Sequence, residues 1–149
     1  MIIPFDQIDT SKKVIIAVTQ WNFWEMTKKC VEDIRKYTNL ENASIVIFDD
    51  NSDDLEAIKW INETDEKVIR MESNIHHNAM VRRLQEKIKD IENIEYLCAM
   101  NNDIIVTKGW LEICYNAWKR IKISCLWVAR TIMTSIVIST LMYLTSLNQ

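Results

Sequence analysis

The sequence predicts an α/β fold in which a mainly parallel β-sheet carries helices on both faces. Short, continuous apolar runs that are rich in β-branched residues alternate with segments whose apolar residues recur at helical spacing. Strands that are apolar throughout are typical of parallel sheets that are buried on both faces. The alternation itself favours a parallel sheet, because each helix carries the chain back to start the next strand. A length of 149 residues fits one such domain.

Four strands are predicted from the apolar runs. The runs are KVIIAVT, SIVIF, KVIRM and IEYLCAM, at 13–19, 44–48, 67–71 and 94–100. Val and Ile dominate the first two runs, and such residues are enriched in strands. A polar cluster follows each run, which marks the end of the strand.

The segments that follow the four runs have helical periodicity. Thr27, Cys30, Val31 and Ile34 would share one face of a helix over 24–37. Apolar residues three or four positions apart also predict helices over 55–61, 80–91 and 110–118. The order is therefore βαβαβαβα.

The composition excludes several classes of function. Eighteen Lys and Arg against 21 Asp and Glu give a net charge of −3, which disfavours a nucleic-acid binder. The single glycine, Gly109, cannot form a glycine-rich phosphate loop or a dinucleotide-binding fingerprint. The four cysteines have neither CxxC nor zinc-site spacing, so we expect reduced thiols in the core.

Polar side chains cluster at the end of every predicted strand. The clusters are at 19–22, 49–52, 73–78 and 101–103. In open α/β sheets, ligands bind beyond the carboxyl ends of the strands, so these clusters predict a ligand site at that rim. The alternative is that each cluster only forms turns and helix caps, as Asn, Asp and Ser commonly do.

The chemistry of this rim suits a nucleotide and a metal ion. Trp21 offers a flat face on which a base can stack, and Asp50 can accept hydrogen bonds from a base or a ribose. Asp103 is a hard oxygen ligand for Mg²⁺ or Mn²⁺, which are commonly completed by waters and substrate phosphates. Arg82 or Arg83 would add a phosphate contact, unless both are simply solvated charges on a helix.

The chain resembles the nucleotide-binding half of family-2, GT-A-type inverting glycosyltransferases. The resemblance covers roughly 12–120, and it rests on VIIAVTQWN, IVIFDDNSD and YLCAMNNDIIVTKGWL, at 14–22, 45–53 and 96–111. It implies a GT-A-like, Rossmann-like fold that binds a nucleotide diphosphate-sugar. Thr19 and Trp21 would line the base pocket, and Asp50 would contact the base or ribose. Asp103 would bind the metal, and Asn102 stands where many members have another Asp.

The resemblance also implies a reaction, the transfer of a sugar to an acceptor hydroxyl with inversion at the anomeric carbon. Such a transfer needs a general base, usually Asp or Glu, which the family's acceptor half supplies. No Asp or Glu follows Glu112 here, so the catalytic residue stays unknown. The acceptor, whether glycan, lipid or protein, is also open. The alternatives are a sugar-nucleotide-binding remnant without activity and a non-enzymatic α/β interaction module.

A second departure lies in the loop after the third strand. The family usually has Gly there, next to the nucleotide, whereas this chain has His76 and His77. One of these side chains would occupy space that the family often leaves empty. Adjacent residues point apart on a helix or strand, so we do not expect the pair to bind a metal together.

The composition divides the chain at residue 122. Residues 1–122 contain 17 of the 18 Lys and Arg and every Asp and Glu, whereas 123–149 contain only Arg130. We therefore expect a nucleotide-sugar-binding domain at 1–122 and an apolar tail at 123–149. The tail has three interpretations. It is a membrane or interfacial segment over 123–147, a set of strands that completes the sheet, or non-native sequence after a truncation or frameshift. The chain opens without a signal-peptide pattern, so a cytoplasmic location is expected, with membrane association under the first interpretation.

Overall fold

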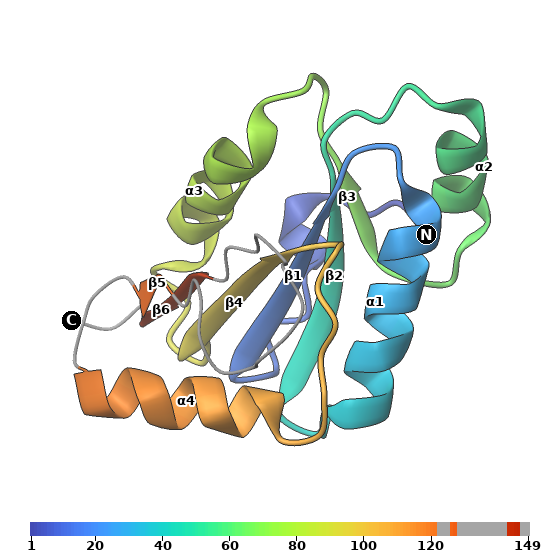
Figure 1. The fold of residues 1–149 in the computed structure, drawn as a ribbon. Helices are drawn as coiled ribbons and strands as arrows, with labels where there is room; N and C mark the ends of the chain where they lie inside the picture. The colour runs from blue at the N-terminus through green and yellow to red at the C-terminus, as the bar shows by residue number, and fades with distance from the viewer. Residues whose placement is uncertain (122–125, 128–142, 147–149) are drawn as a thin grey trace.

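Six strands form one sheet within residues 1–121, 126–127 and 143–146, which are the residues that the computed structural model describes. Their order across the sheet is β3-β2-β1-β4-β6-β5 (Figure 1). The first four of these are parallel to one another: β1 (Val14–Gln20), β2 (Ala43–Asp49), β3 (Val68–Arg70) and β4 (Tyr96–Asn101). The predicted α/β fold with a mainly parallel sheet is confirmed.

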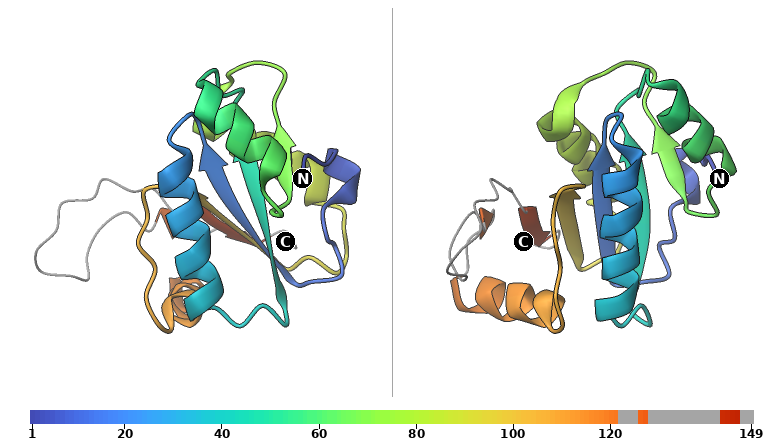
Figure 2. Two further views of the ribbon diagram at one scale, coloured as in Figure 1. Left: turned by 90° about the vertical axis from the view of Figure 1, so that its right-hand side faces the viewer. Right: turned by 45° about the vertical axis from the view of Figure 1, so that its right-hand side comes forward.

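Helices cover both faces of this sheet, as predicted (Figures 1 and 2). On one face, α1 (Trp24–Tyr37), α2 (Leu55–Glu63) and α4 (Trp110–Ile121) pack over one apolar core. On the other face, α3 (His76–Ile88) and the short 3₁₀ helix η1 (Phe5–Gln7) cover a second core. Because alternate strand residues point to opposite faces, fully apolar strands supply both cores at once.

Most bounds of the helices and strands differ from the predicted ones by a few residues, and in two cases the structure shows the cause. The third helix begins at His76 rather than at 80, because the Asp50 carboxylate accepts hydrogen bonds from the backbone amides of Ile75 and His76. The fourth strand begins at Tyr96 rather than at 94, because a turn bond joins the amide of Ile94 to the carbonyl of Ile91. The third strand is shorter at both ends than the predicted 67–71.

The tail contributes two short strands to the described part of the chain. β6 (Tyr143–Ser146) pairs antiparallel with β4, and β5 (Leu126–Trp127) pairs with β6. Residues 122–125, 128–142 and 147–149 lie outside the described residues, and with them most of the tail on which the three interpretations rest. Among the residues that are described, no helix is long and apolar enough to span a bilayer.

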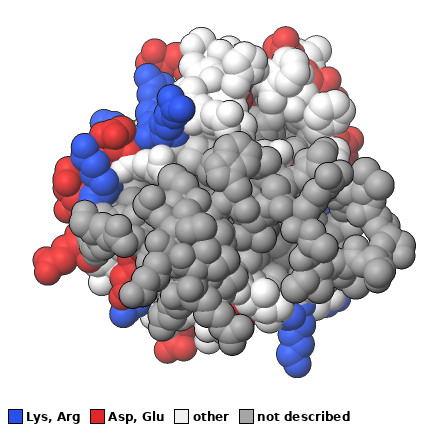
Figure 3. Space-filling view, turned by 60° about the vertical axis from the view of Figure 1, so that its left-hand side comes forward, with Lys and Arg blue, Asp and Glu red and all other residues white. Residues whose placement is uncertain are grey.

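The distribution of surface charges and the burial of the thiols agree with what the composition predicts. Basic and acidic side chains are interspersed on the face shown in Figure 3, in keeping with the small net charge. Cys30, Cys98 and Cys114 are buried free thiols, as predicted, while Cys125 lies outside the described residues. Burial, followed by the charges of Asp33 and Asp103, raises the pKa of Cys30 to about 12, so this thiol is protonated at neutral pH.

Candidate functional site

The carboxyl ends of three central strands lie in register at one rim of the sheet. Thr19 of β1 pairs with Asn101 of β4, and Gln20 of β1 pairs with Asp49 of β2. The loops that follow these strands therefore emerge side by side. The register brings together the predicted clusters at 19–22, 49–52 and 101–103.

Thr19 is buried at this rim, and its hydroxyl is already engaged. The Oγ1 atom lies 2.7 Å from Nδ1 of His77 and 3.2 Å from the carbonyl oxygen of Met100. The Asn101 Oδ1 atom is 3.4 Å away. Thr19 thus joins β1, β4 and the start of α3, and His77 occupies the space beside it.

Trp21 is presented to solvent by a loop that is held on both sides. Its side chain is 49% exposed. The preceding Gln20 accepts a backbone hydrogen bond from Asp50. The following Asn22 adopts a left-handed conformation, with φ of +63°, and its backbone amide donates to Ser52 Oγ at 2.7 Å. Asn is among the residues that tolerate this conformation. The rim therefore holds an exposed indole in a defined place.

A buried polar network underlies this loop. The carboxylate of Asp49 is fully buried and pairs with the Arg70 guanidinium at 3.1 Å. Ser52 donates to both carboxylate oxygens of Asp49, through its hydroxyl and its backbone amide. The Gln20 side chain donates to the same carboxylate at 3.3 Å. Arg70 also donates to the Ser52 carbonyl at 2.7 Å. The network ties together the ends of β1, β2 and β3.

Asp50 holds the start of α3. Its two carboxylate oxygens accept hydrogen bonds from the backbone amides of Ile75 and His76, at 2.7 and 2.8 Å. His76 has a φ of +64°, so these two hydrogen bonds hold a residue in the left-handed conformation at the start of the helix. A carboxylate has about four lone-pair sites, so Asp50 retains acceptor capacity. Asp50 is only 3% exposed.

His77 is half-buried between Thr19 and Asp50. Burial lowers the pKa of His77 below its usual value, whereas the charge of Asp50 raises it.

The lowered pKa of His77 predicts a pH-dependent stability. As pH falls, the imidazole of His77 is protonated in the unfolded chain before it is protonated in the folded chain. We therefore expect the free energy of unfolding to decrease as pH falls from about 6.5 toward the lowered folded pKa. His77→Asn should reduce this decrease in urea titrations at pH 7.5, 6.5 and 5.5. A pH dependence of His77→Asn equal to that of the parent chain would contradict the assignment.

Asn102 and Asp103 lie at the end of β4, against α1. The Asn102 amide donates to the carbonyl of Phe23 at 3.2 Å and to Thr27 Oγ1 at 3.0 Å, which fastens the loop after β4 to the start of α1. Asp103 lines a groove of about 510 Å³ between the two elements. The other residues of this groove are Glu25, Met26, Lys29, Cys30, Asp33, Asn102, Ile104 and Ile105.

The Oδ1 atom of Asp103 is buried without a hydrogen-bond partner among the described residues. A buried carboxylate oxygen without a donor is costly, and a cation would satisfy it. The described residues contain no group of three or more His, Cys, Asp or Glu arranged around a metal. One carboxylate fits Mg²⁺ or Mn²⁺ that is shared with substrate phosphates, since these ions keep several non-protein ligands.

Arg82 and Arg83 lie elsewhere. Both are exposed on α3, which covers the sheet face opposite to the Asp103 groove. Arg83 approaches Met71, with Nη1 at 3.7 Å from the sulfur. The structure therefore brings Thr19, Trp21, Asp50, Asn102 and Asp103 to one rim, and it leaves the two arginines on the α3 side.

Sequence reasoning missed the residues that support the rim. Asp49 and Ser52 stood in the predicted polar cluster, but no role was assigned to them. Arg70 was predicted only to lie within the third strand. The signal that could have singled it out is a lone Arg at the end of a buried strand, next to an Asp-Asp pair on the neighbouring strand.

Comparisons with known proteins agree with this architecture. The model of the family described as "Glycosyl transferase family 2" matches residues 14–135, which extends beyond the boundary predicted at residue 122. No curated protein matches the chain.

Solved structures share the fold. S. aureus TarS 1–349 is 19% identical with a TM-score of 0.53, and the match covers 83% of this chain and 39% of that one. Its complex with UDP-GlcNAc gives 18% identity, a TM-score of 0.53 and coverage of 83% and 37%. The Pyrobaculum calidifontis mannosyltransferase PcManGT, in complex with GDP-Man and Mn²⁺, is 13% identical with a TM-score of 0.56, and the match covers 76% of this chain and 34% of that one.

At these identities, the likeness to solved structures concerns the fold alone. The chain spans between a third and two fifths of the length of these proteins. The family model, by contrast, covers most of the sequence, including the three β-strand ends that form the rim and the whole segment around Asp103. The chain belongs to glycosyl transferase family 2.

Proposed function

We propose that this chain binds a nucleotide diphosphate-sugar together with a divalent cation, for inverting transfer of the sugar to an acceptor hydroxyl. The observation that carries the proposal is the buried carboxylate oxygen of Asp103, which has no hydrogen-bond partner among the described residues and lies at the rim that also presents Trp21. Two of the similar structures support it, since one is a complex with GDP-Man and Mn²⁺ and the other a complex with UDP-GlcNAc.

Each residue of the rim has a proposed part in binding the donor. Trp21 stacks on the base, and Asp50 accepts a hydrogen bond from the base or ribose with its remaining lone pairs. Thr19 forms the floor of this site together with His77. Asn102 holds the loop after β4 in place, so that Asp103 faces the groove. The contribution of Arg82 and Arg83 to phosphate binding requires the donor to extend toward α3.

Asp103 would hold the cation, Mg²⁺ or Mn²⁺. When bound, such a cation neutralises negative charge on the leaving diphosphate. The protein's own contribution is orientation, because the rim is held by the Asp49 network and needs little rearrangement when a ligand arrives.

A second candidate function is nucleotide-sugar binding without transfer. It is favoured by one observation, that no Asp or Glu follows Glu112 in these 149 residues. Inverting transfer needs a general base close to the acceptor hydroxyl. A chain that binds the donor but lacks this base would leave the sugar in place.

Calorimetry with the purified chain tests the proposal. UDP, GDP, CDP, ADP and TDP are titrated with and without Mn²⁺. We expect at least one of them to bind, and Mn²⁺ to tighten the binding. Absence of binding by a folded chain would reject the donor site. Binding of the matching nucleotide sugar without release of nucleotide to any tested acceptor would favour the second candidate.

Trp21→Ala provides a further prediction about the base site. We expect the nucleotide diphosphate to bind about tenfold more weakly, because stacking on an aromatic side chain contributes roughly 1–3 kcal/mol per base. The melting temperature should change little, since half of the indole is exposed. The neighbouring Phe23 is 63% exposed and serves as the control. If Phe23→Ala weakened binding as much as Trp21→Ala, the stacking role of Trp21 would be refuted.

A further inference from the structure

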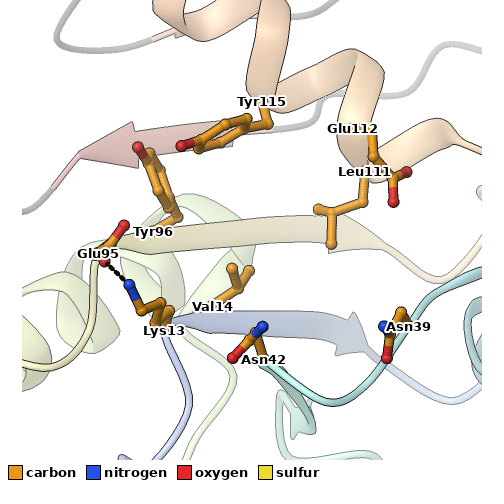
Figure 4. A pocket seen from close by; sticks show the side chains of 9 residues that line it. All are labelled: Lys13, Val14, Asn39, Asn42, Glu95, Tyr96, Leu111, Glu112 and Tyr115. Carbon is orange, nitrogen blue, oxygen red and sulfur yellow. Dashed lines mark hydrogen bonds and ion pairs between the residues drawn. The ribbon is translucent and has the colours of Figure 1, made fainter.

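A second pocket lies at the opposite end of the sheet from the rim, where β1 and β4 begin (Figure 4). Its volume is about 370 Å³, within the range of small-molecule sites. The seven residues of β1 separate it from the rim by roughly 20 Å. It is therefore distinct from the proposed donor site.

The pocket forms because α4 passes beside the amino-terminal ends of β1 and β4. Trp110 and Cys114 of this helix are buried in the core. Leu111 and Tyr115, which are four positions apart on the same helix, are only partly buried and line the pocket instead. Figure 4 shows these two side chains extending from α4 toward Val14 and Tyr96 of the sheet.

One part of the lining is apolar and aromatic. The rings of Tyr96 and Tyr115 meet edge to face, with centroids 5.1 Å apart and planes at 82°. Burial, with a contribution from the hydrogen bond to Tyr115, raises the pKa of Tyr96 to about 12, so the phenol is neutral. Val14 and Leu111 continue this apolar strip along the pocket (Figure 4).

The other part of the lining carries polar side chains, two of which have no partner among the described residues. Within the described part of the chain, neither the carboxylate of Glu112 nor the side-chain amide of Asn42 takes part in a hydrogen bond or an ion pair. Lys13, by contrast, is held by Glu95 at 2.6 Å (Figure 4). The lining thus offers a free amide and a free carboxylate, but its cation is already neutralised.

This combination selects one class of ligand. A phosphate or nucleotide is disfavoured, because Lys13 is neutralised and Glu112 repels anions. A purely apolar ligand would gain nothing from the amide of Asn42 and the carboxylate of Glu112, which are both exposed. A saccharide has a C–H face that packs on an aromatic or aliphatic strip, and hydroxyls that donate to carboxylates and pair with amides.

We propose that this pocket binds a neutral saccharide. The sugar ring packs on Tyr115 and Leu111, and its hydroxyls bond to Glu112 and Asn42. This goes beyond the proposed donor chemistry, because the site holds glycan rather than nucleotide sugar. If one glycan were held both in this pocket and at the rim, the local concentration of glycan near the donor would rise.

Saturation-transfer NMR with methyl glycosides of glucose, galactose, mannose and N-acetylglucosamine tests the proposal. We expect at least one glycoside to bind with Kd on the order of 1 mM, the weak range expected of a shallow site. Tyr115→Ala and Glu112→Gln should each weaken this binding about tenfold. Tyr115→Phe should retain most of it, because it keeps the ring. Ile113→Ala is the control, since Ile113 is exposed on the same helix and does not line the pocket.

The outcomes separate this site from the donor site. Asp103→Asn should leave glycoside binding unchanged, and Tyr115→Ala should leave Mn²⁺-dependent nucleotide binding unchanged. Circular dichroism melting curves verify that each variant is folded. The proposal is overturned if no glycoside binds to the parent chain, or if the folded Tyr115→Ala and Glu112→Gln variants bind as well as Ile113→Ala does.

Discussion

Asp103→Asn is expected to abolish the Mn²⁺ dependence of nucleotide diphosphate binding and to weaken that binding at least about 100-fold. Loss of a group that only supports a metal ligand commonly costs 10–100-fold in metal affinity, so loss of the ligand itself should cost at least as much. The substitution preserves shape and removes one negative charge. Calorimetric titration of the nucleotide diphosphate, with and without Mn²⁺, measures both effects.

The same groove offers a matched control. Glu25 also lines it, and Glu25→Gln removes one negative charge there without altering the buried oxygen of Asp103. We expect this variant to bind within about twofold of the parent chain. Equal losses in the two variants would indicate a general effect of charge and would reject Asp103 as the ligand. Asp103→Asn should not lower the melting temperature, because its Oδ1 atom has no hydrogen bond to lose among the described residues.

Arg70→Met is expected to lower the free energy of unfolding by about 3 kcal/mol. Breaking a buried ion pair costs roughly 3–5 kcal/mol, because the remaining charge stays buried without its counter-ion. Asp49 is fully buried, whereas a quarter of the Arg70 side chain is exposed, which favours the lower end of this range. Urea titration of the two-state transition gives the value.

Arg35→Met is the control for this effect. Arg35 forms a bidentate pair with Glu66, but half of the Arg35 side chain is exposed. Exposed ion pairs contribute about 1 kcal/mol or less, so this variant should remain close to the parent chain. In the double variant Asp49→Asn/Arg70→Met, the buried charge is removed, and part of the lost stability should return. Equal costs for Arg70→Met and Arg35→Met would contradict the burial argument.

Much of the fold follows from the order of residues along the chain. The run VIIAVT has the composition of a strand that is buried on both faces, and the structure has β1 there. The spacing of Thr27, Cys30, Val31 and Ile34 predicts the helix over 24–37, and α1 has these bounds. Both signals are local, because strand and helix periodicity depend on neighbours within one or two turns.

Only part of the candidate site could be predicted from the sequence. That the polar clusters share a rim follows from a general property of parallel sheets, which the pairing of Thr19 with Asn101 bears out. The start of α3 did not follow, because it depends on Asp50, which is 25 residues earlier in the chain. The roles of Trp21 in base binding and of Asp103 in metal binding remain predictions.

The sequence by itself determined the fold class, the approximate bounds of the helices and strands, and which polar clusters lie at the rim. Only the tertiary structure decided that Arg70 neutralises Asp49, that His77 contacts Thr19, and that Asp103 faces α1 while Arg82 and Arg83 lie with α3. The physical reason is range. Periodicity encodes which face of an element is apolar, whereas a buried ion pair or a groove depends on strand register and helix placement, which many distant contacts set together.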